Sequence, residues 1–195
     1  MNNIIKKPRK TGSIGHITLD QIHQLLNTID KRKYNIRNTQ RDKILIESLV
    51  DSCLRISELL NVTPDDIKNQ EIRVLGKGSK YRTIAISKQM AQKLIMFAQL
   101  TRTPPDKRIF NISRQLVHNM IKRTFKESAI KKPDGVGHVH ILRHTGAILF
   151  LEKSGDSHAL LKKLGHTTFK MMYRYLSTRA ELSSLETQKE VDIWE

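Results

Sequence analysis

Two clusters of arginine and histidine have the residue types and spacings needed to bind a phosphodiester. In the segment LRISELL, Arg55 is followed three residues later by Glu58, which lies one helical turn away and can orient the guanidinium. In HILRH, His140 and Arg143 are also three residues apart and share one helix face. Two guanidiniums and an imidazole suit the negative charge that spreads over the oxygens during phosphoryl transfer. Taken alone, the first cluster also fits a solvated helix end, and the second a structural salt bridge on an apolar helix.

Two further motifs supply groups that donate protons or attack phosphorus. The segment GKGSK at 76–80 has the glycines of a hairpin turn, from which Lys77 or Lys80 would reach into a groove and donate a proton. The motif LGH ends at His166 and is followed nine residues later by Tyr175. Tyrosine is a poor nucleophile near its ordinary pKa of about 10, and a cationic cluster beside it favours the phenolate. Taken singly, these residues also fit a basic turn, a helix end and a core position.

Other assignments compete for some of these residues. Tyr173 precedes Tyr175 by two positions, so on a helix the two side chains point about 200° apart and only one can be the nucleophile. His138, His140 and His144 have spacings that also occur among zinc ligands. No cysteine or carboxylate cluster completes such a site, so we expect no metal. No GxxxxGK[ST] motif is present, which favours chemistry without ATP.

A mainly helical fold must position these residues. Apolar residues recur at helical spacing along most of the chain, whereas 71–75 and 81–86 alternate like the two strands of a hairpin. We therefore expect a mainly α fold with a small antiparallel β-sheet, in the α+β class. Helices are expected at about 18–29, 39–53, 57–61, 87–101, 113–128, 139–154, 157–164 and 168–177, with one turn opened by Thr63-Pro64 and a last helix after Thr178.

The composition favours a nucleic-acid partner. The 195 residues carry 35 Lys and Arg against 19 Asp and Glu, a formal charge of +16, and 38% of them are apolar, which is enough for a core. Nucleic acid is the expected polyanion ahead of an anionic membrane surface, and 5% aromatic residues argue against base-stacking folds. The sequence shows no membrane span and no secretory signal, and Cys53 is the single cysteine. We expect a soluble, cytoplasmic, nucleoid-associated protein.

Together and in this order, the motifs resemble those of the tyrosine recombinase, or phage integrase, family. The matching segments are LRISELL, GKGSKYR, HILRHT, and LGH with a tyrosine nine residues on. The resemblance covers about residues 17–180 and extends to Xer-like enzymes, compact integrases and fimbrial inverters. It implies a site-specific recombinase that cuts and rejoins DNA strands without metal, cofactor or ATP.

The resemblance also assigns a role to each candidate residue. Tyr175 would attack the scissile phosphate, leaving a 3′-phosphotyrosine and a free 5′-hydroxyl, and the spacing from His166 selects it over Tyr173. Arg55 and Arg143 would bind the non-bridging oxygens of the phosphate, and His166 would donate a further hydrogen bond to it. Lys77 would protonate the leaving oxygen, and His140 would help to take the tyrosine proton. Glu58 and Lys80 would support the site.

One part of the family's usual architecture has no counterpart in this sequence. Most members carry a helical core-binding domain before the catalytic domain, whereas about 16 residues precede it here. We expect a basic tail at 1–16, a catalytic domain at 17–177, and a C-terminal helix at 178–195 that is exchanged with a neighbouring protomer. The expected partners are double-stranded DNA, further copies of the chain (dimer to tetramer) and an accessory DNA-binding protein. The residues expected to contact DNA are Lys6, Lys7, Arg9, Lys10, Lys80 and Arg82.

Two other functions fit the same residues. A type IB topoisomerase-like nicking-closing enzyme uses the same set of Arg, Lys, His and Tyr side chains and would show no site preference on DNA. A DNA-binding regulator with this fold would recombine nothing, although every active-site residue type is present here.

Overall fold

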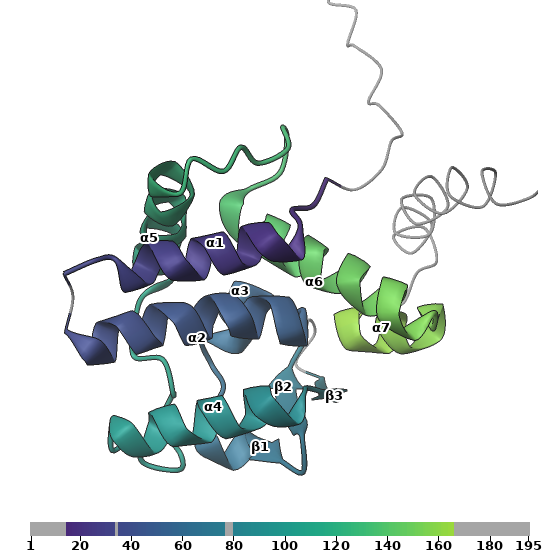
Figure 1. Ribbon diagram of the computed structural model, residues 1–195. Coiled ribbons are helices and arrows are strands. Elements are labelled where there is room, and N and C mark those ends of the chain that lie inside the picture. The colour runs from purple at the N-terminus through teal and green to yellow at the C-terminus, as the bar shows by residue number, and fades with distance from the viewer. Residues whose placement is uncertain (1–14, 34, 77–79, 166–195) are drawn as a thin grey trace, which may run out of the picture.

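Helix α2 (Ile36–Ser52) lies at the centre of the helical part of the fold. The computed structural model describes residues 15–33, 35–76 and 80–165. Figure 1 shows α1 (Leu19–Asp30) on one side of α2 and α4 (Lys88–Leu100) on the other. Helix α6 (His138–Ser154) also packs against α2, and α5 (Arg114–Glu127) packs against α1 and α6.

The helices begin where side-chain caps satisfy their first N–H groups. The Thr18 hydroxyl accepts a hydrogen bond from the Gln21 backbone (3.2 Å) while the Gln21 side chain accepts from the Thr18 backbone (3.0 Å), and the two bonds form a capping box. Helix α2 begins at Ile36, earlier than expected from its apolar pattern, because the Asn35 side chain accepts from the Asn38 N–H (2.9 Å).

The sheet has three antiparallel strands in the order β1 (Ile67–Lys68), β2 (Glu71–Leu75) and β3 (Tyr81–Ala85). The hairpin of β2 and β3 confirms the prediction, whereas β1, of two residues, is too short to show an alternating pattern. Ile72 pairs with Ile84 and Val74 with Arg82, and the three apolar members of these pairs are buried. Since side chains alternate along a strand, Arg82 lies on the inner face of the sheet.

A second, smaller apolar cluster lies beside the main core and holds the end of the chain that the structure describes. It joins α6 to α7 (Ser157–Leu164) and contains Cys53, Ala147, Ile148, Leu151, Leu160 and Leu164. Cys53 ends α2 in a left-handed conformation (φ 53°) and so turns the chain toward α3 (Ile56–Leu59). Burial raises the pKa of its thiol to about 12, so this cysteine is a packing residue and not a nucleophile.

The mainly α fold with a small antiparallel sheet is therefore confirmed. Thr63-Pro64 opens a single 3₁₀ turn (Pro64–Asp66), as predicted. The helices expected at 168–177 and after Thr178 lie outside the described residues. Among the described helices, none combines the length and the apolar character that crossing a membrane requires.

The close approach of α6 to α2 depends on Gly146. A Cβ at this position would overlap the carbonyl oxygen of Val50, which is held within α2. We expect Gly146→Ala to lower the free energy of unfolding by about 1–3 kcal/mol, because neither helix backbone can yield locally. Urea denaturation measures this change.

Gly137→Ala, at the N-cap of the same helix, is the control. Its added Cβ would lie 3.5 Å from His140 Nδ1, which is an ordinary contact. We expect this variant to lose less than about 1 kcal/mol. Equal stability of the two variants would contradict the proposed role of Gly146.

Candidate active site

The carboxylate of Glu58 is the centre of the candidate site. Glu58 is buried at the start of α3, where its side chain caps the helix. The Arg55 backbone N–H donates to Glu58 Oε2 (2.9 Å) and the Arg55 guanidinium donates to Oε1 (3.0 Å). The spacing of three residues in LRISELL thus produces the contact that the sequence predicted, with the Arg55 side chain 41% exposed and able to reach a ligand.

Arg82 reaches the same carboxylate from β3. Its two terminal nitrogens donate to the two oxygens of Glu58, each at 3.0 Å, in the bidentate geometry that favours arginine. We expected Arg82 among the residues that contact DNA; the structure places its guanidinium on Glu58, with the side chain 20% exposed. An inward-facing arginine on a strand needs an anionic partner, and this alternation is the sequence signal for the contact.

Arg143 brings α6 and α7 to the same point. The residue is 6% exposed, and its Nη2 donates to the carbonyl oxygen of Leu164 (2.9 Å) at the end of α7. Its Nη1 lies 3.9 Å from Glu58 Oε2. We call Arg55, Arg82 and Arg143 around Glu58 the arginine cluster.

The arginine cluster carries more positive than negative charge. Three guanidiniums surround one carboxylate, which leaves two positive charges in excess. Burial raises the pKa of Glu58, but the hydrogen bonds from Arg82 and from the Arg55 backbone outweigh it and hold the pKa below its ordinary value. The carboxylate is therefore ionised at neutral pH, and the cluster as a whole attracts an anion.

Gly165 allows the end of α7 to lie against this cluster. The glycine has a left-handed backbone (φ 65°) that closes α7, and a Cβ at this position would overlap the guanidinium of Arg82. Gly165, where the described part of the chain ends, therefore lies directly beside the arginine cluster.

His140 is exposed on α6, one turn before Arg143. Partial burial lowers its pKa, and the positive charge of Arg143 lowers it further, with smaller effects from His118 and Arg114 of α5. The imidazole is thus neutral at neutral pH and can accept a proton. His118 and Arg114 were not predicted as neighbours of this site, since only the packing of α5 on α6 brings them there.

His138, at the start of the same helix, has a packing role. The ring of His138 packs edge-on against Phe125, with 5.3 Å between the ring centroids. Within the described ranges, no three His, Cys, Asp or Glu side chains are grouped to hold a metal ion.

The base of the predicted hairpin lies within the described residues, whereas several other predicted site residues do not. The Gly76 N–H donates to the Lys80 carbonyl (2.9 Å), which closes the base of the turn, and Lys80 itself is exposed. The predicted residues that the structure does not describe are Lys6, Lys7, Arg9, Lys10, Lys77, His166, Tyr173 and Tyr175.

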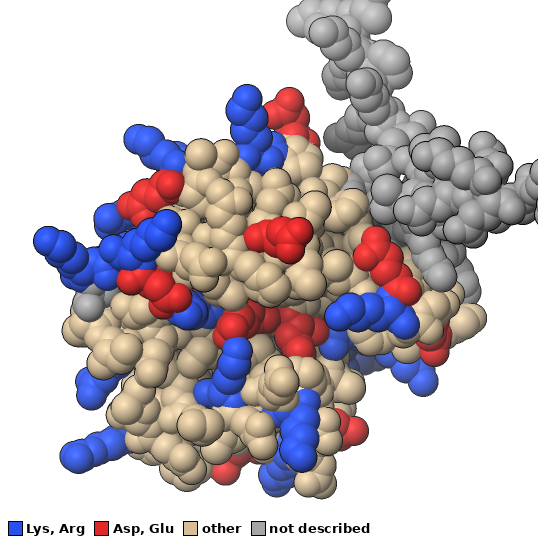
Figure 2. Space-filling model, in the orientation of Figure 1, with Lys and Arg blue, Asp and Glu red and all other residues tan. Residues whose placement is uncertain are grey.

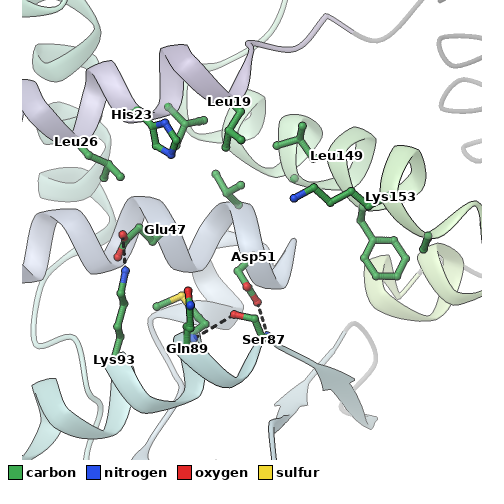
Figure 3. A pocket seen from close by; sticks show the side chains of 16 residues that line it. Leu19, His23, Leu26, Glu47, Asp51, Ser87, Gln89, Lys93, Leu149 and Lys153 are labelled. Atoms are coloured by element: carbon green, nitrogen blue, oxygen red, sulfur yellow. Dashed lines mark hydrogen bonds and ion pairs between the residues drawn. The ribbon is translucent and has the colours of Figure 1, made fainter. Parts of the chain in front are cut away.

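A cleft of about 550 Å³ lies apart from the arginine cluster, between α1, α2, α4 and α6 (Figure 3). Leu19, Leu26 and Leu149 line it together with an ion pair between Lys93 and Glu47 (2.7 Å). On this face of the molecule, basic and acidic side chains are interspersed, and acidic side chains lie near its centre (Figure 2). Neither the cleft nor this face gathers the positive charge that a phosphate requires.

The arrangement predicts a strong, pH-dependent effect of Glu58→Gln. The variant leaves three guanidiniums without their carboxylate, so we expect a loss of about 3–5 kcal/mol in unfolding free energy at pH 7. The folded-state pKa of Glu58 is depressed, so its contribution is present above the unfolded value and is lost as the pH falls below about 4.5. Denaturation of both proteins between pH 7 and pH 3 should show the difference shrinking on the acid side.

Glu152→Gln is the control, since Glu152 is exposed on α6. It should change the unfolding free energy by less than about 0.5 kcal/mol at any of these pH values. A Glu58→Gln protein as stable as this control would contradict the proposed role of Glu58.

The known proteins with similar sequences include several that are named tyrosine recombinases. "Tyrosine recombinase XerC" of Histophilus somni is 30% identical over 159 residues, covering 78% of this chain and 52% of that protein. "Tyrosine recombinase XerC" of Pseudomonas aeruginosa is 31% identical over 167 residues, covering 83% and 54%. The chain thus spans about half the length of the relatives it matches.

Solved structures share the fold. The XerH site-specific recombinase bound to its difH substrate superposes with a TM-score of 0.71 at 21% identity, covering 94% of this chain and 54% of that one. The catalytic domain of bacteriophage HP1 integrase superposes with a TM-score of 0.65 at 24% identity, covering 90% of this chain and 95% of that domain.

The sequence model of the phage integrase family matches residues 16–181. This range includes all four segments that suggested the resemblance, and its start coincides with the first residues of the described fold. The chain belongs to the phage integrase family.

Proposed function

We propose that this chain is a site-specific DNA recombinase that cuts and rejoins strands through a covalent phosphotyrosine. The observation that carries the proposal is the arginine cluster, because its excess of two positive charges lies where three elements meet and suits one phosphodiester. The family membership and the relatives named as tyrosine recombinases support the same activity.

In the proposed reaction the Tyr175 oxygen bonds to the scissile phosphorus and the bond to the 5′-oxygen breaks. The phenolic proton passes to His140, whose lowered pKa keeps the ring neutral and receptive. Lys77 gives a proton to the leaving 5′-oxygen. Attack by a 5′-hydroxyl reverses these steps, and the phosphotyrosine conserves the bond energy in the meantime.

Each arginine of the cluster has its own part in this proposal. Arg55 is exposed enough to donate to a non-bridging oxygen while Glu58 fixes its orientation. Arg143 is buried and donates from α6, with Leu164 holding one side of its guanidinium. Arg82 keeps Glu58 in place through its two hydrogen bonds, and His166 adds a further donor to the phosphate.

We further propose that the chain acts on duplex DNA as a homo-oligomer. XerH was solved in complex with its difH substrate, which supports DNA as the partner. Lys80 and the basic tail (Lys6, Lys7, Arg9 and Lys10) supply contacts to the DNA backbone, and residues 178–195 dock on a neighbouring copy. An accessory DNA-binding protein is a further partner in this proposal.

Replacing the nucleophile tests the chemistry. A pool of nicked duplexes with a randomised arm should give a covalent protein–DNA band with the wild-type protein and with Tyr173→Phe. Tyr175→Phe should give none, because it has no oxygen to bond to phosphorus. Denaturing gels measure the band, and sequencing of the trapped DNA measures site preference.

Two results would count against this assignment. A Tyr175→Phe protein that still traps DNA would move the nucleophile elsewhere. Trapped DNA without any enriched sequence would indicate nicking and closing in place of site-specific recombination.

The proton acceptor can be tested through pH. Only neutral imidazole accepts a proton, and the pKa of His140 lies below its ordinary value of 6.5. We expect the single-turnover cleavage rate to stay constant down to below pH 6.5 and to fall only at lower pH. His140→Asn should lower the cleavage rate about 100-fold and remove its fall at low pH.

His23→Asn serves as the control, because His23 lines the cleft of Figure 3 and not the arginine cluster. Its pH profile should match the wild type. A wild-type rate that already falls at or above pH 6.5 would be inconsistent with His140 as the acceptor.

Deletion of residues 181–195 tests the docking of the C-terminal segment. The truncated protein should bind a single DNA site but form fewer dimers and tetramers on DNA, as sedimentation velocity measures. An unchanged distribution of oligomers would refute this role of the segment.

A further inference from the structure

Lys163 is a buried lysine for which the chemistry above has no use. It lies in the last turn of α7 and is 9% exposed. Its ammonium donates to the carbonyl oxygen of Ala85 at 2.6 Å and lies 5.3 Å from the centroid of the Phe150 ring. No carboxylate pairs with it among the residues that the structure describes.

Burial at this position is unfavourable in free energy for a charged lysine side chain. Burying an ammonium without an acidic partner loses much of its hydration, and the neighbouring residues of α7, Leu160 and Leu164, belong to an apolar cluster. A leucine or methionine at 163 would pack there at lower cost. What offsets the cost is a charge-assisted hydrogen bond to Ala85, which is shorter and stronger than a neutral one.

The accepting carbonyl lies on the open edge of the sheet. The Ile86 N–H donates to the Gln70 carbonyl across the ladder (2.8 Å), so the preceding residue, Ala85, occupies a non-hydrogen-bonded position. Its carbonyl therefore faces away from β2. Since β3 is an edge strand, this carbonyl is available to α7, which packs against β3.

Each of the two elements that Lys163 joins is followed or preceded in the sequence by a residue of the proposed chemistry. β3 ends at Ala85 and begins next to the turn that contains Lys77. α7 ends at Leu164 and leads through Gly165 into His166. Arg143 holds the carbonyl of Leu164 (2.9 Å), so consecutive residues of α7 are tied to α6 and to β3.

We propose that Lys163 is a positioning residue that clamps the end of α7 to the edge of β3. The clamp fixes the hairpin that carries Lys77 relative to the segment that carries His166. This inference rests on the proposed function, because it assigns the clamp to the delivery of a proton by Lys77.

The experiment compares two scissile linkages in Lys163→Met. One duplex has the normal 5′-oxygen leaving group, and the other has sulfur in its place, which leaves without a proton. We expect Lys163→Met to cleave the oxygen substrate about 10- to 100-fold more slowly than the wild type, because a displaced acid loses its geometry. The sulfur substrate should be cleaved within about threefold of the wild-type rate, since it needs no acid.

Two variants control for charge and packing. Lys163→Arg retains an N–H donor and should keep at least about a third of the wild-type rate on oxygen. Lys162→Met removes an exposed lysine from the same turn and should change neither rate. Equal slowing of Lys163→Met on both substrates, or no slowing on either, would overturn the proposal.

Hydrogen exchange tests the clamp without any DNA chemistry. Amides of α7 should exchange about 10-fold faster or more in Lys163→Met than in the wild type, while those of α1 should not change. Unchanged exchange in α7 would refute the clamp even if catalysis were affected. A wild-type protein that forms no adduct with either substrate would refute the proposed function, and the exchange result would then decide on the clamp alone.

Discussion

A single buried carboxylate, that of Glu58, determines how the site is assembled. It accepts two hydrogen bonds from Arg55, one of them from the backbone, and two from Arg82, and it lies 3.9 Å from Arg143. These residues come from α3, β3 and α6, so one anion fixes three elements relative to each other. Because one negative charge holds three positive ones, the assembled site still attracts an anion, and the single negative charge of a bound phosphodiester would offset half of the excess.

The rest of the fold keeps these elements in register. Gly146 lets α6 lie directly on α2, which ends at Cys53 just before Arg55. Arg143 of α6 donates to the Leu164 carbonyl and Lys163 of α7 donates to the Ala85 carbonyl, so the end of α7 is hydrogen-bonded to both α6 and β3. Backbone carbonyls used in this way let a cationic site be built without neutralising it, because they accept hydrogen bonds and carry no net charge.

The sequence predicted the parts of this site that depend on local spacing. Arg55 and Glu58 lie one helical turn apart, and Arg143 lies on an apolar helix that had to bury it, so both assignments followed from periodicity. Contacts between distant residues were not predictable in this way. Arg82 and Glu58 are 24 residues apart and Lys163 and Ala85 are 78 apart, so each pair meets only once the hairpin packs against α3 and α7. β1, of two residues, left no pattern to recognise.

In the proposed function, Glu58 and Arg82 form a fixed support while Arg55 and Arg143 bind the scissile phosphate. A crystal structure of Tyr175→Phe bound to an uncleaved duplex tests it most directly. We expect Arg55 and Arg143 to donate to non-bridging oxygens of one phosphate at about 2.7–3.0 Å, with Arg82 still paired to both oxygens of Glu58. A phosphate bound away from these two arginines, or an Arg82 that leaves Glu58 to bind it, would refute these roles.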